Sequence, residues 1–285
     1  MTDLRKKMLQ DMRIRNLSPH TLKCYVEHVA RFAKHFKKSP DLLAPEHIRG
    51  YQVYLLEERK ASTSVLIQAV CALRFLYRIT LGRDLIIDFI PYPKKPKRFP
   101  VILSRGQVAL LFEVVRNLKH QTILKTIYSA GLRVSEAVGL RLEDINSQRM
   151  VIVVRQGKGQ KDRLVPLSPS ALLEQLRIYW LKYRPKGWLF PGQNPDRPLS
   201  RDAVGQVVEA ARRAAHLQKG VSPHTLRHCF ATHQLEAGVD IRIIQILLGH
   251  TILRSTQWYT HVASKTVLST RSPLDLLPTI PPTQQ

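Results

Sequence analysis

The sequence predicts a mainly α protein of two domains, with a small antiparallel β-sheet in the second domain. Three observations support this prediction. Apolar residues recur with helical spacing over most of the chain, a proline-rich segment interrupts them after residue 90, and two β-branched runs flank a glycine-rich turn. With 285 residues, of which 44% are hydrophobic, the chain is long enough to bury two cores.

The first predicted domain, residues 1–90, is a small bundle of helices. Ser18 is a good N-cap, and Pro19 suits the first position of the helix that follows. The stretches PEHIRGYQVYLLEE and STSVLIQAVCALRFLYRIT continue with the same helical period. The apolar face of the helix after Ser18 consists of Leu22, Tyr25, Val26, Val29, Phe32 and Phe36.

The segment after residue 90 can form neither a helix nor a central strand. Pro91 to Pro100, PYPKKPKRFP, holds four prolines and four basic residues in ten, and proline lacks the backbone donor that both structures need. We expect residues 91–103 to form an extended basic linker that can follow a phosphate backbone. A solvated linker with incidental charge is the alternative. The side chains predicted to contact DNA are Lys94, Lys95, Lys97 and Arg98.

The second predicted domain, residues 104–271, is mostly helical. Ser104 can cap a helix that runs through Val115, and a second helix leads to YSAGLRVSEAVGL. The stretch RMVIVVRQGKGQKDRLVPL then holds two β-branched runs around a glycine-rich turn, as β-hairpins do. Residues 272–285 are rich in proline, so we expect a flexible C-terminal tail. Further helices are expected to begin near Ser170, Ser200 and Ser222.

Positive charge is in excess along the whole chain. There are 45 lysines and arginines against 21 aspartates and glutamates, a net charge of +24. Such a field attracts polyanions, so DNA or RNA is the first expected partner; a basic protein without a nucleic-acid partner is the alternative. Apolar runs such as LIIDFI are too short to span a membrane, and the N-terminus lacks a secretory signal. Three cysteines without metal-type spacing fit a reducing cytosol, so we expect a cytoplasmic, nucleoid-associated protein.

The stretch VSPHTLRHCFATH places two candidate side chains at the start of one helix. Ser222 and Pro223 suit the N-cap and the first helical position, which brings His224 and Arg227 onto one face. The free amides of that first turn also favour an anion. His228 can share the same face, so spacing alone does not choose between the two histidines. The structural alternative is a core histidine beside a surface arginine.

Two further basic residues stand where a side chain can reach a cleft. Gly131 suits the end of one helix, and Arg133 opens the next in AGLRVSEAVGL. Lys158 lies between two glycines at the tip of the predicted hairpin, in GKGQK, where little bulk surrounds its amine. Each feature alone is also typical of an exposed surface, and GKGQK lacks the spacing of a Walker-type phosphate loop.

The histidines do not match a known metal-binding pattern. The spacing of His224 and His228 suits zinc, but Thr225 stands where a zinc protease helix carries glutamate, and no carboxylate lies between the pair. We therefore expect no metal and no other cofactor.

Together these residues are rich in donors and poor in acceptors. Guanidinium groups match the oxygens of a phosphodiester and stabilise the charge that builds there in the transition state. The stretch GHTILRSTQWYTHV adds Tyr259, a phenol that becomes a good nucleophile only when cations and a base favour its phenolate. Lysine is a suitable acid for a leaving sugar oxygen. The set indicates attack by Tyr259 on a DNA phosphate, with a packing role for Tyr259 as the alternative.

The order of these residues resembles that of the tyrosine recombinases, the phage integrase-like family, and most closely its Xer-type bacterial members. The matching stretches, in chain order, are GLRVSEAVGL, GKGQKDRLVPL, SPHTLRHCFATH, LLGH and YTHV. The resemblance implies a C-shaped clamp around duplex DNA, made of a helical core-binding (SAM-like) domain and a catalytic domain. It also implies a site-specific recombinase that cleaves and rejoins DNA through a 3′-phosphotyrosine, without ATP. The expected task is DNA integration or excision, or replicon dimer resolution.

The same resemblance implies roles for the basic residues. Arg133 and Arg227 would hold the scissile phosphate, His250 would assist them, and Lys158 would be the general acid.

The resemblance implies three further roles. His224, rather than His228, would be the general base, and Tyr259 would be the nucleophile. Glu136 matches a family position that supports the active site without taking part in the chemistry.

The expected partner is duplex DNA with paired half-sites, bound by a homo-oligomer that forms a dimer on each site and a tetramer in synapsis. A second recombinase subunit is an option that the sequence leaves open. After YTHV the chain departs from the family, because the segment that follows is short and soon broken by Pro273. Two alternatives are a type IB topoisomerase-like enzyme and a catalytically silent DNA-binding protein with the same fold.

Overall fold

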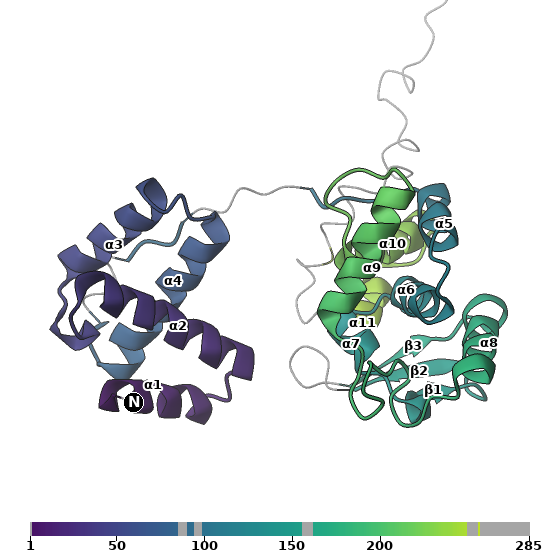
Figure 1. Ribbon diagram of the computed structural model, residues 1–285, viewed down its shortest axis with the longest axis horizontal. Coiled ribbons are helices and arrows are strands. Elements are labelled where there is room, and N and C mark those ends of the chain that lie inside the picture. The colour runs from purple at the N-terminus through teal and green to yellow at the C-terminus, as the bar shows by residue number, and fades with distance from the viewer. Residues whose placement is uncertain (1, 85–89, 94–98, 156–161, 250–255, 257–285) are drawn as a thin grey trace, which may run out of the picture. The chain divides into compact units, whose positions relative to one another are not determined.

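The chain forms two compact units, Met1–Arg98 and Phe99–Gln285. The structure, a computed structural model, describes residues 2–84, 90–93, 99–155, 162–249 and 256. Both units are mainly helical, and the second carries a small antiparallel sheet (Figure 1), so the predicted fold class is confirmed. The predicted domain limits at residues 90, 103 and 271 stay predictions.

The described part of the N-terminal unit is a bundle of helices. Its predicted second helix starts as expected, because the Ser18 hydroxyl accepts a hydrogen bond from the Thr21 N–H at 3.1 Å. Phe32 on that helix is fully buried and packs edge-on against Tyr51, with ring centroids 5.2 Å apart. The elements are α1 (Asp3–Ile14), α2 (Pro19–Phe36), η1 (Pro40–Leu42), α3 (Pro45–Glu57), α4 (Thr63–Phe75) and η2 (Leu76–Thr80).

The stretch formed by α4 and η2 is the most apolar part of this bundle. By length and composition, Thr63–Thr80 could cross a membrane, but 44% of it is buried inside the protein. Leu66, Val70, Leu73 and Leu76 all lie in the N-terminal core. The stretch is apolar because these residues pack into the core of the N-terminal unit.

The C-terminal unit contains helices around one main core and a smaller apolar cluster between α10 and α11, with the sheet at one end (Figure 1). α5 ends at Glu113, two residues earlier than predicted, because the chain turns there and Asn117 caps the next helix with a bond from the His120 N–H. The helical elements are α5 (Arg105–Glu113), α6 (Leu118–Ala130), α7 (Val134–Val138), η4 (Leu142–Asp144), η5 (Pro169–Leu173), α8 (Glu174–Tyr183), α9 (Arg201–Ala214), α10 (Pro223–Glu236) and α11 (Ile241–Leu248).

The sheet contains the predicted hairpin and one strand more. β2 (Val151–Val154) pairs antiparallel with β3 (Arg163–Pro166), and Val154 lies opposite Arg163. A two-residue strand that the sequence pattern did not predict, β1 (Ile145–Asn146), pairs with the other edge of β2. Strands this short carry too little alternation to be recognised from sequence.

Helix packing brings distant parts of the C-terminal unit together. α10 packs against α6, and α11 packs against both α10 and β3 (Figure 1). The first half of α10 therefore lies near the end of α6, the start of α7, the start of β3 and the end of α11.

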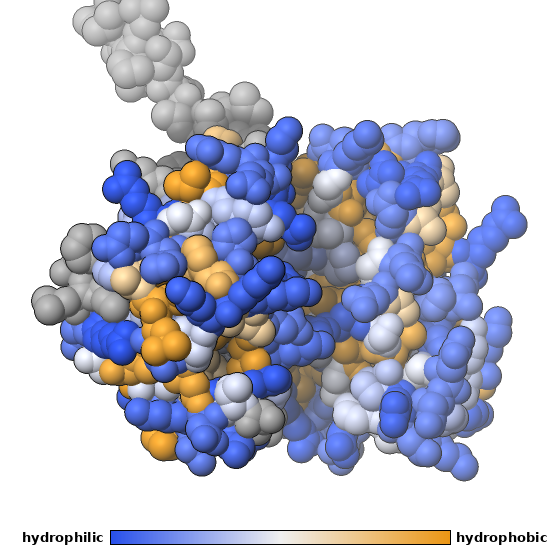
Figure 2. Space-filling view, turned by 60° about the vertical axis from the view of Figure 1, so that its left-hand side comes forward, coloured by the Kyte–Doolittle hydropathy of each residue, from blue (hydrophilic) through white to orange (hydrophobic). Residues whose placement is uncertain are grey.

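On the face shown in Figure 2, most of the described surface is hydrophilic, and hydrophobic residues form small patches within it.

Candidate active site

The carboxylate of Glu136 organises the candidate active site. Its side chain is only 6% exposed, and arginines from three different elements approach it. These are Arg133 at the start of α7, Arg163 at the start of β3 and Arg227 in α10. One buried carboxylate thus gathers three cations, of which the sequence predicted Arg133 and Arg227.

Arg133 is held by both its backbone and its side chain. Its N–H donates to Glu136 Oε2 at 2.7 Å, which caps the first turn of α7, and its Nη1 donates to Glu136 Oε1 at 2.7 Å. In the described part of the chain, Nε and Nη2 of Arg133 have no acceptor. The side chain is 20% exposed, so these two nitrogens can reach a ligand.

Arg227 is the most deeply buried of the three arginines. Only 1% of its side chain is exposed, and its Nη1 donates to the Gly131 carbonyl at 2.7 Å. Its Nη2 donates to the Leu248 carbonyl at 2.5 Å, and Glu136 Oε2 lies 3.5 Å from Nη1. The guanidinium group therefore joins the end of α6 to the end of α11.

Arg163 was not among the predicted site residues. Its Nη1 and Nη2 donate to the two oxygens of Glu136 at 2.9 and 2.8 Å, and its Nε donates to the Leu247 carbonyl at 2.7 Å. A sequence signal does exist, because strand residues alternate between faces and Arg163 is in phase with the buried Val165. A charged residue on the core-facing side of a strand indicates a buried partner.

The three arginines keep Glu136 ionised. Burial alone would raise the pKa of its carboxyl group, but hydrogen bonds from Arg163 and from the Arg133 backbone, together with the nearby positive charges, lower it to about 2. The cluster therefore combines three guanidinium charges with one carboxylate charge, and the excess is positive. Such an excess favours an anionic ligand.

Two histidines lie beside this cluster on α10. The rings of His224 and His228 meet edge-on with centroids 4.5 Å apart. His224 keeps solvent access, yet partial desolvation of its ring lowers its pKa, and the charges of Arg227 and Arg133 lower it further. Burial, followed by the charges of His224 and Arg227, lowers the pKa of His228 to about 4. Both rings are therefore neutral at pH 7, and His224 is the more exposed of the two.

Several predicted residues lie outside the described residues. Within the described ranges, the histidine, cysteine, aspartate and glutamate side chains form no group of three that could hold a metal ion. The predicted residues outside the described ranges are Lys94, Lys95, Lys97, Arg98, Lys158, His250 and Tyr259.

Comparison with protein families matches both units of the chain. The model of the phage integrase family matches residues 102–266, and that of the N-terminal SAM-like domain of phage integrases matches residues 4–87. A Sinorhizobium fredii protein named as an integrase/recombinase, y4qK, is 52% identical over 284 residues, which is 99% of this chain and 92% of the relative.

Solved structures resemble the chain as well. The crystal structure of XerA recombinase is 30% identical with a TM-score of 0.54, and the match covers 95% of this chain and 99% of that one. A lambda integrase dimer bound to a COC′ core site has a TM-score of 0.74 over 91% of this chain and 94% of its own. At 17% identity, the second match concerns the fold alone.

Proposed function

The chain belongs to the phage integrase family of tyrosine recombinases, and we propose that it cleaves and rejoins duplex DNA through a covalent 3′-phosphotyrosyl intermediate formed by Tyr259. The observation that carries the proposal is the cluster of three arginines around Glu136. In a set of fixed cations, the donors are in place before negative charge develops on phosphorus, so little reorganisation is needed during the reaction.

Arg133 and Arg227 are the proposed ligands of the scissile phosphate. Arg133 supports this role because its Nε and Nη2 have no acceptor among the described residues and its side chain is 20% exposed. Arg227 contributes its charge from a buried position, where low polarity strengthens the interaction with a phosphate. His250 is proposed to assist them; it follows Gly249, the residue that caps α11.

Proton transfer is assigned to His224 and Lys158. A neutral imidazole can accept the phenol proton of Tyr259, and the lowered pKa of His224 keeps the ring neutral at pH 7. The phenolate oxygen then bonds to phosphorus while the bond from phosphorus to the 5′ oxygen of deoxyribose breaks. Lys158 gives that oxygen its proton. Attack of a 5′ hydroxyl on the phosphotyrosine reverses each step and rejoins the strand.

The substrate is proposed to be duplex DNA with paired half-sites, bound by a dimer on each site and a tetramer in synapsis. The DNA-bound lambda integrase dimer, whose fold is similar, supports this assembly, as does the net charge of +24. A second recombinase subunit stays part of the proposal. We also propose a cytoplasmic, nucleoid-associated location, where integration, excision or replicon dimer resolution takes place.

A suicide substrate tests the proposed chemistry. Mapping protein–DNA cross-links in the source genome supplies the site, and a nicked duplex of that sequence traps the intermediate after cleavage. We expect the wild-type chain to form a covalent adduct, and Tyr259→Phe to form none while binding the same duplex in a gel shift. An adduct with Tyr259→Phe would refute the assignment. Recombinant products from a two-site plasmid would exclude a topoisomerase-like activity, which relaxes supercoils without exchanging strands.

A further inference from the structure

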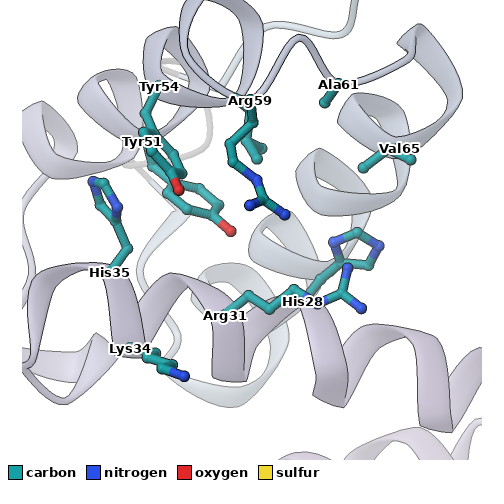
Figure 3. Close-up of a pocket in the computed structure, with 10 residues that line it drawn as sticks. His28, Arg31, Lys34, His35, Tyr51, Tyr54, Arg59, Ala61 and Val65 are labelled. Carbon is teal, nitrogen blue, oxygen red and sulfur yellow. The ribbon is translucent and has the colours of Figure 1, made fainter.

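A pocket of about 680 Å³ lies in the N-terminal unit, between α2, α3 and the start of α4 (Figure 3). No carboxylate lines it. Histidines 28 and 35 add two rings, and the polar side chains that the following argument uses are Arg31, Lys34, Tyr51, Tyr54 and Arg59. The pocket is therefore rich in donors, and it is separate from the Glu136 cluster in the other unit.

Tyr51 forms the rigid wall of this pocket. It is only 3% exposed, and its ring packs between Phe32 and Tyr54, with centroids 5.2 and 5.9 Å away. Its hydroxyl forms no hydrogen bond to another described residue, and it is not among the fully buried unpaired polar atoms of those residues, so solvent reaches it. Figure 3 shows that hydroxyl, the hydroxyl of Tyr54 and the Arg59 guanidinium pointing into the same space. A hydroxyl that opens into a cavity on a packed ring can donate to a ligand there.

Three exposed cations line the same pocket, Arg31 and Lys34 from α2 and Arg59 after α3. Burial raises the pKa of Tyr51, and the charges of Arg31 and Arg59 oppose that rise. In the described part of the chain the side chains of Arg59 and Lys34 have no ion-pair partner, and Arg31 has only a contact of 3.9 Å with Glu27. Several cations that line one hollow without a carboxylate favour an anionic ligand.

We propose that this pocket binds a phosphate group of the DNA backbone through Arg31, Arg59 and the Tyr51 hydroxyl. The proposal rests on the DNA binding proposed above. Guanidinium forks match two phosphate oxygens at once, and a hydroxyl on a rigid ring fixes a third donor at little entropic cost. An inorganic phosphate ion offers the same chemistry, so the experiment must separate the two sources.

The test uses the full chain and a duplex that the wild type binds. We expect Arg59→Ala to weaken binding roughly tenfold and to reduce the slope of log K against log salt by about 1. Tyr51→Phe removes only the hydroxyl and keeps the packed ring, so a smaller loss of about threefold is expected. Arg13→Ala, an exposed arginine of α1, is the matched control and should leave affinity and slope nearly unchanged.

Three results would contradict the proposal that this pocket binds a DNA phosphate. In the first, Arg59→Ala and Tyr51→Phe bind DNA as the wild type does, with the same salt slope. In the second, Arg13→Ala loses as much as Arg59→Ala, which would reduce the effect to net charge. In the third, calorimetry shows inorganic phosphate binding that Arg59→Ala abolishes while DNA affinity stays unchanged. If the wild type itself fails to bind DNA, the proposed function fails, and this result is distinguishable from all three.

A second, independent observation concerns Arg163. All three of its nitrogens donate to groups of the protein itself, and only 8% of its side chain is exposed. Its guanidinium group is therefore held in place by the protein. It joins β3 to Glu136 and to the Leu247 carbonyl in the last turn of α11.

Arg163 also shapes the chain just before His250. A side chain on Gly249 would place its Cβ 3.1 Å from Arg163 Cδ and 3.3 Å from Nη1, so the arginine occupies the space next to this glycine. Gly249 has φ of +60°, which suits glycine, and it is followed in the sequence by His250. We infer that Arg163 is a positioning residue, which orients Glu136 and the exit of α11 for the proposed strand cleavage.

A double-mutant cycle tests this role. Arg163→Met is expected to slow covalent capture about 100-fold, because small misplacements of a catalytic group have effects of that size, while DNA affinity stays within about threefold. Arg163→Lys should recover only part of the rate, since one ammonium group cannot bridge a carboxylate and a carbonyl. In a Glu136→Gln background the Arg163→Met effect should be much smaller, because the two residues act as a unit.

The matched control is Arg155→Met. Arg155 also pairs with a buried carboxylate, Asp144, at 2.6 Å, and stands beside the same sheet. It should change capture by less than about threefold. Arg163 would lose its assigned role if its effects and those of Glu136 added independently, or if Arg155→Met slowed capture equally.

Discussion

The two units hold their arginines in opposite ways. In the C-terminal unit, Arg163 and Arg227 are almost fully buried and donate to Glu136 or to backbone carbonyls. In the N-terminal unit, Arg31 and Arg59 are exposed at the rim of a pocket, and the described residues give Arg59 no acceptor. Arginine side chains are thus fixed by the protein in the C-terminal unit and left open to a ligand in the N-terminal pocket.

This difference separates chemistry from binding. Fixed, partly desolvated cations stabilise charge that appears only in the transition state, because their orientation is already set before the reaction. Exposed cations interact with phosphates that are charged throughout, and salt screens them strongly. Changes around Glu136 should therefore affect stability and cleavage, whereas changes in the pocket should affect affinity.

The largest expected effect is that of Glu136→Gln on folding. Three guanidinium groups would then lie together without their counter-charge, and breaking a buried ion pair from one side costs about 3–5 kcal/mol. Denaturant unfolding measures the loss. The control is Glu174→Gln in the exposed pair Glu174–Arg177, where both side chains are more than half exposed, and it should cost less than about 1 kcal/mol. Equal losses in both variants would remove the distinction between the buried and the exposed pair.

Lowering the pH should remove the stabilisation of the fold by ionised Glu136 without a mutation. The pKa of Glu136 is about 2 in the folded chain, below its ordinary value of 4.5. The ionised carboxylate therefore stabilises the fold fully above pH 4.5, and this stabilisation is lost as the pH falls from 4.5 through 2. The difference in unfolding free energy between wild type and Glu136→Gln should be largest near pH 7 and shrink in that window. A difference that does not vary with pH would contradict this.

The next expected effect is that of Arg133→Ala on DNA cleavage. Arg133→Ala should slow covalent capture about 100- to 1000-fold, the cost of losing one donor to a developing charge. Affinity for the duplex should fall by only about threefold, because many other phosphate contacts persist. Arg59→Ala should show the reverse pattern. Gel shifts beside a suicide-substrate assay measure both quantities, and parallel losses in either variant would contradict the separation.

The last comparison takes one glycine from each unit. Gly131 and Gly82 have φ of +61° and +65°, so alanine should cost about 1–2 kcal/mol at both. A Cβ at Gly131 would overlap the ring of Phe230, whereas nothing lies within 4 Å of a Cβ at Gly82, so Gly131→Ala should cost a further 1–3 kcal/mol or so. Thermal unfolding measures both. Because the Gly131 carbonyl accepts from Arg227, only Gly131→Ala should also slow covalent capture.

Local features of the molecule were predictable. Ser18 and Ser104 cap the helices expected of them, because a cap depends on residues within one turn. The hairpin of β2 and β3 followed from two β-branched runs around a turn. His224 and Arg227 were expected in the first turns of one helix, and α10 holds both. A resemblance in five ordered motifs led to the family.

What could not be predicted depends on long-range packing. Arg163 and Glu136 are 27 residues apart, and Arg227 and the Gly131 carbonyl are 96 apart, so no local pattern links them. Spacing left His224 and His228 equivalent, whereas the fold exposes one ring and lowers the pKa of the other to about 4. The pocket around Tyr51 likewise needs α2 and α3 to pack before its donors converge.

Composition, helical period and ordered motifs were enough to predict two mainly helical units, a polyanionic partner and, through the family resemblance, a tyrosine-based chemistry, because each of these depends on residue type and short spacing. Folding then determined which cations are held by the protein and which remain open to a ligand. The held arginines contact a buried carboxylate from separate elements of the chain. Only the packing of α7, β3, α10 and α11 brings these side chains together.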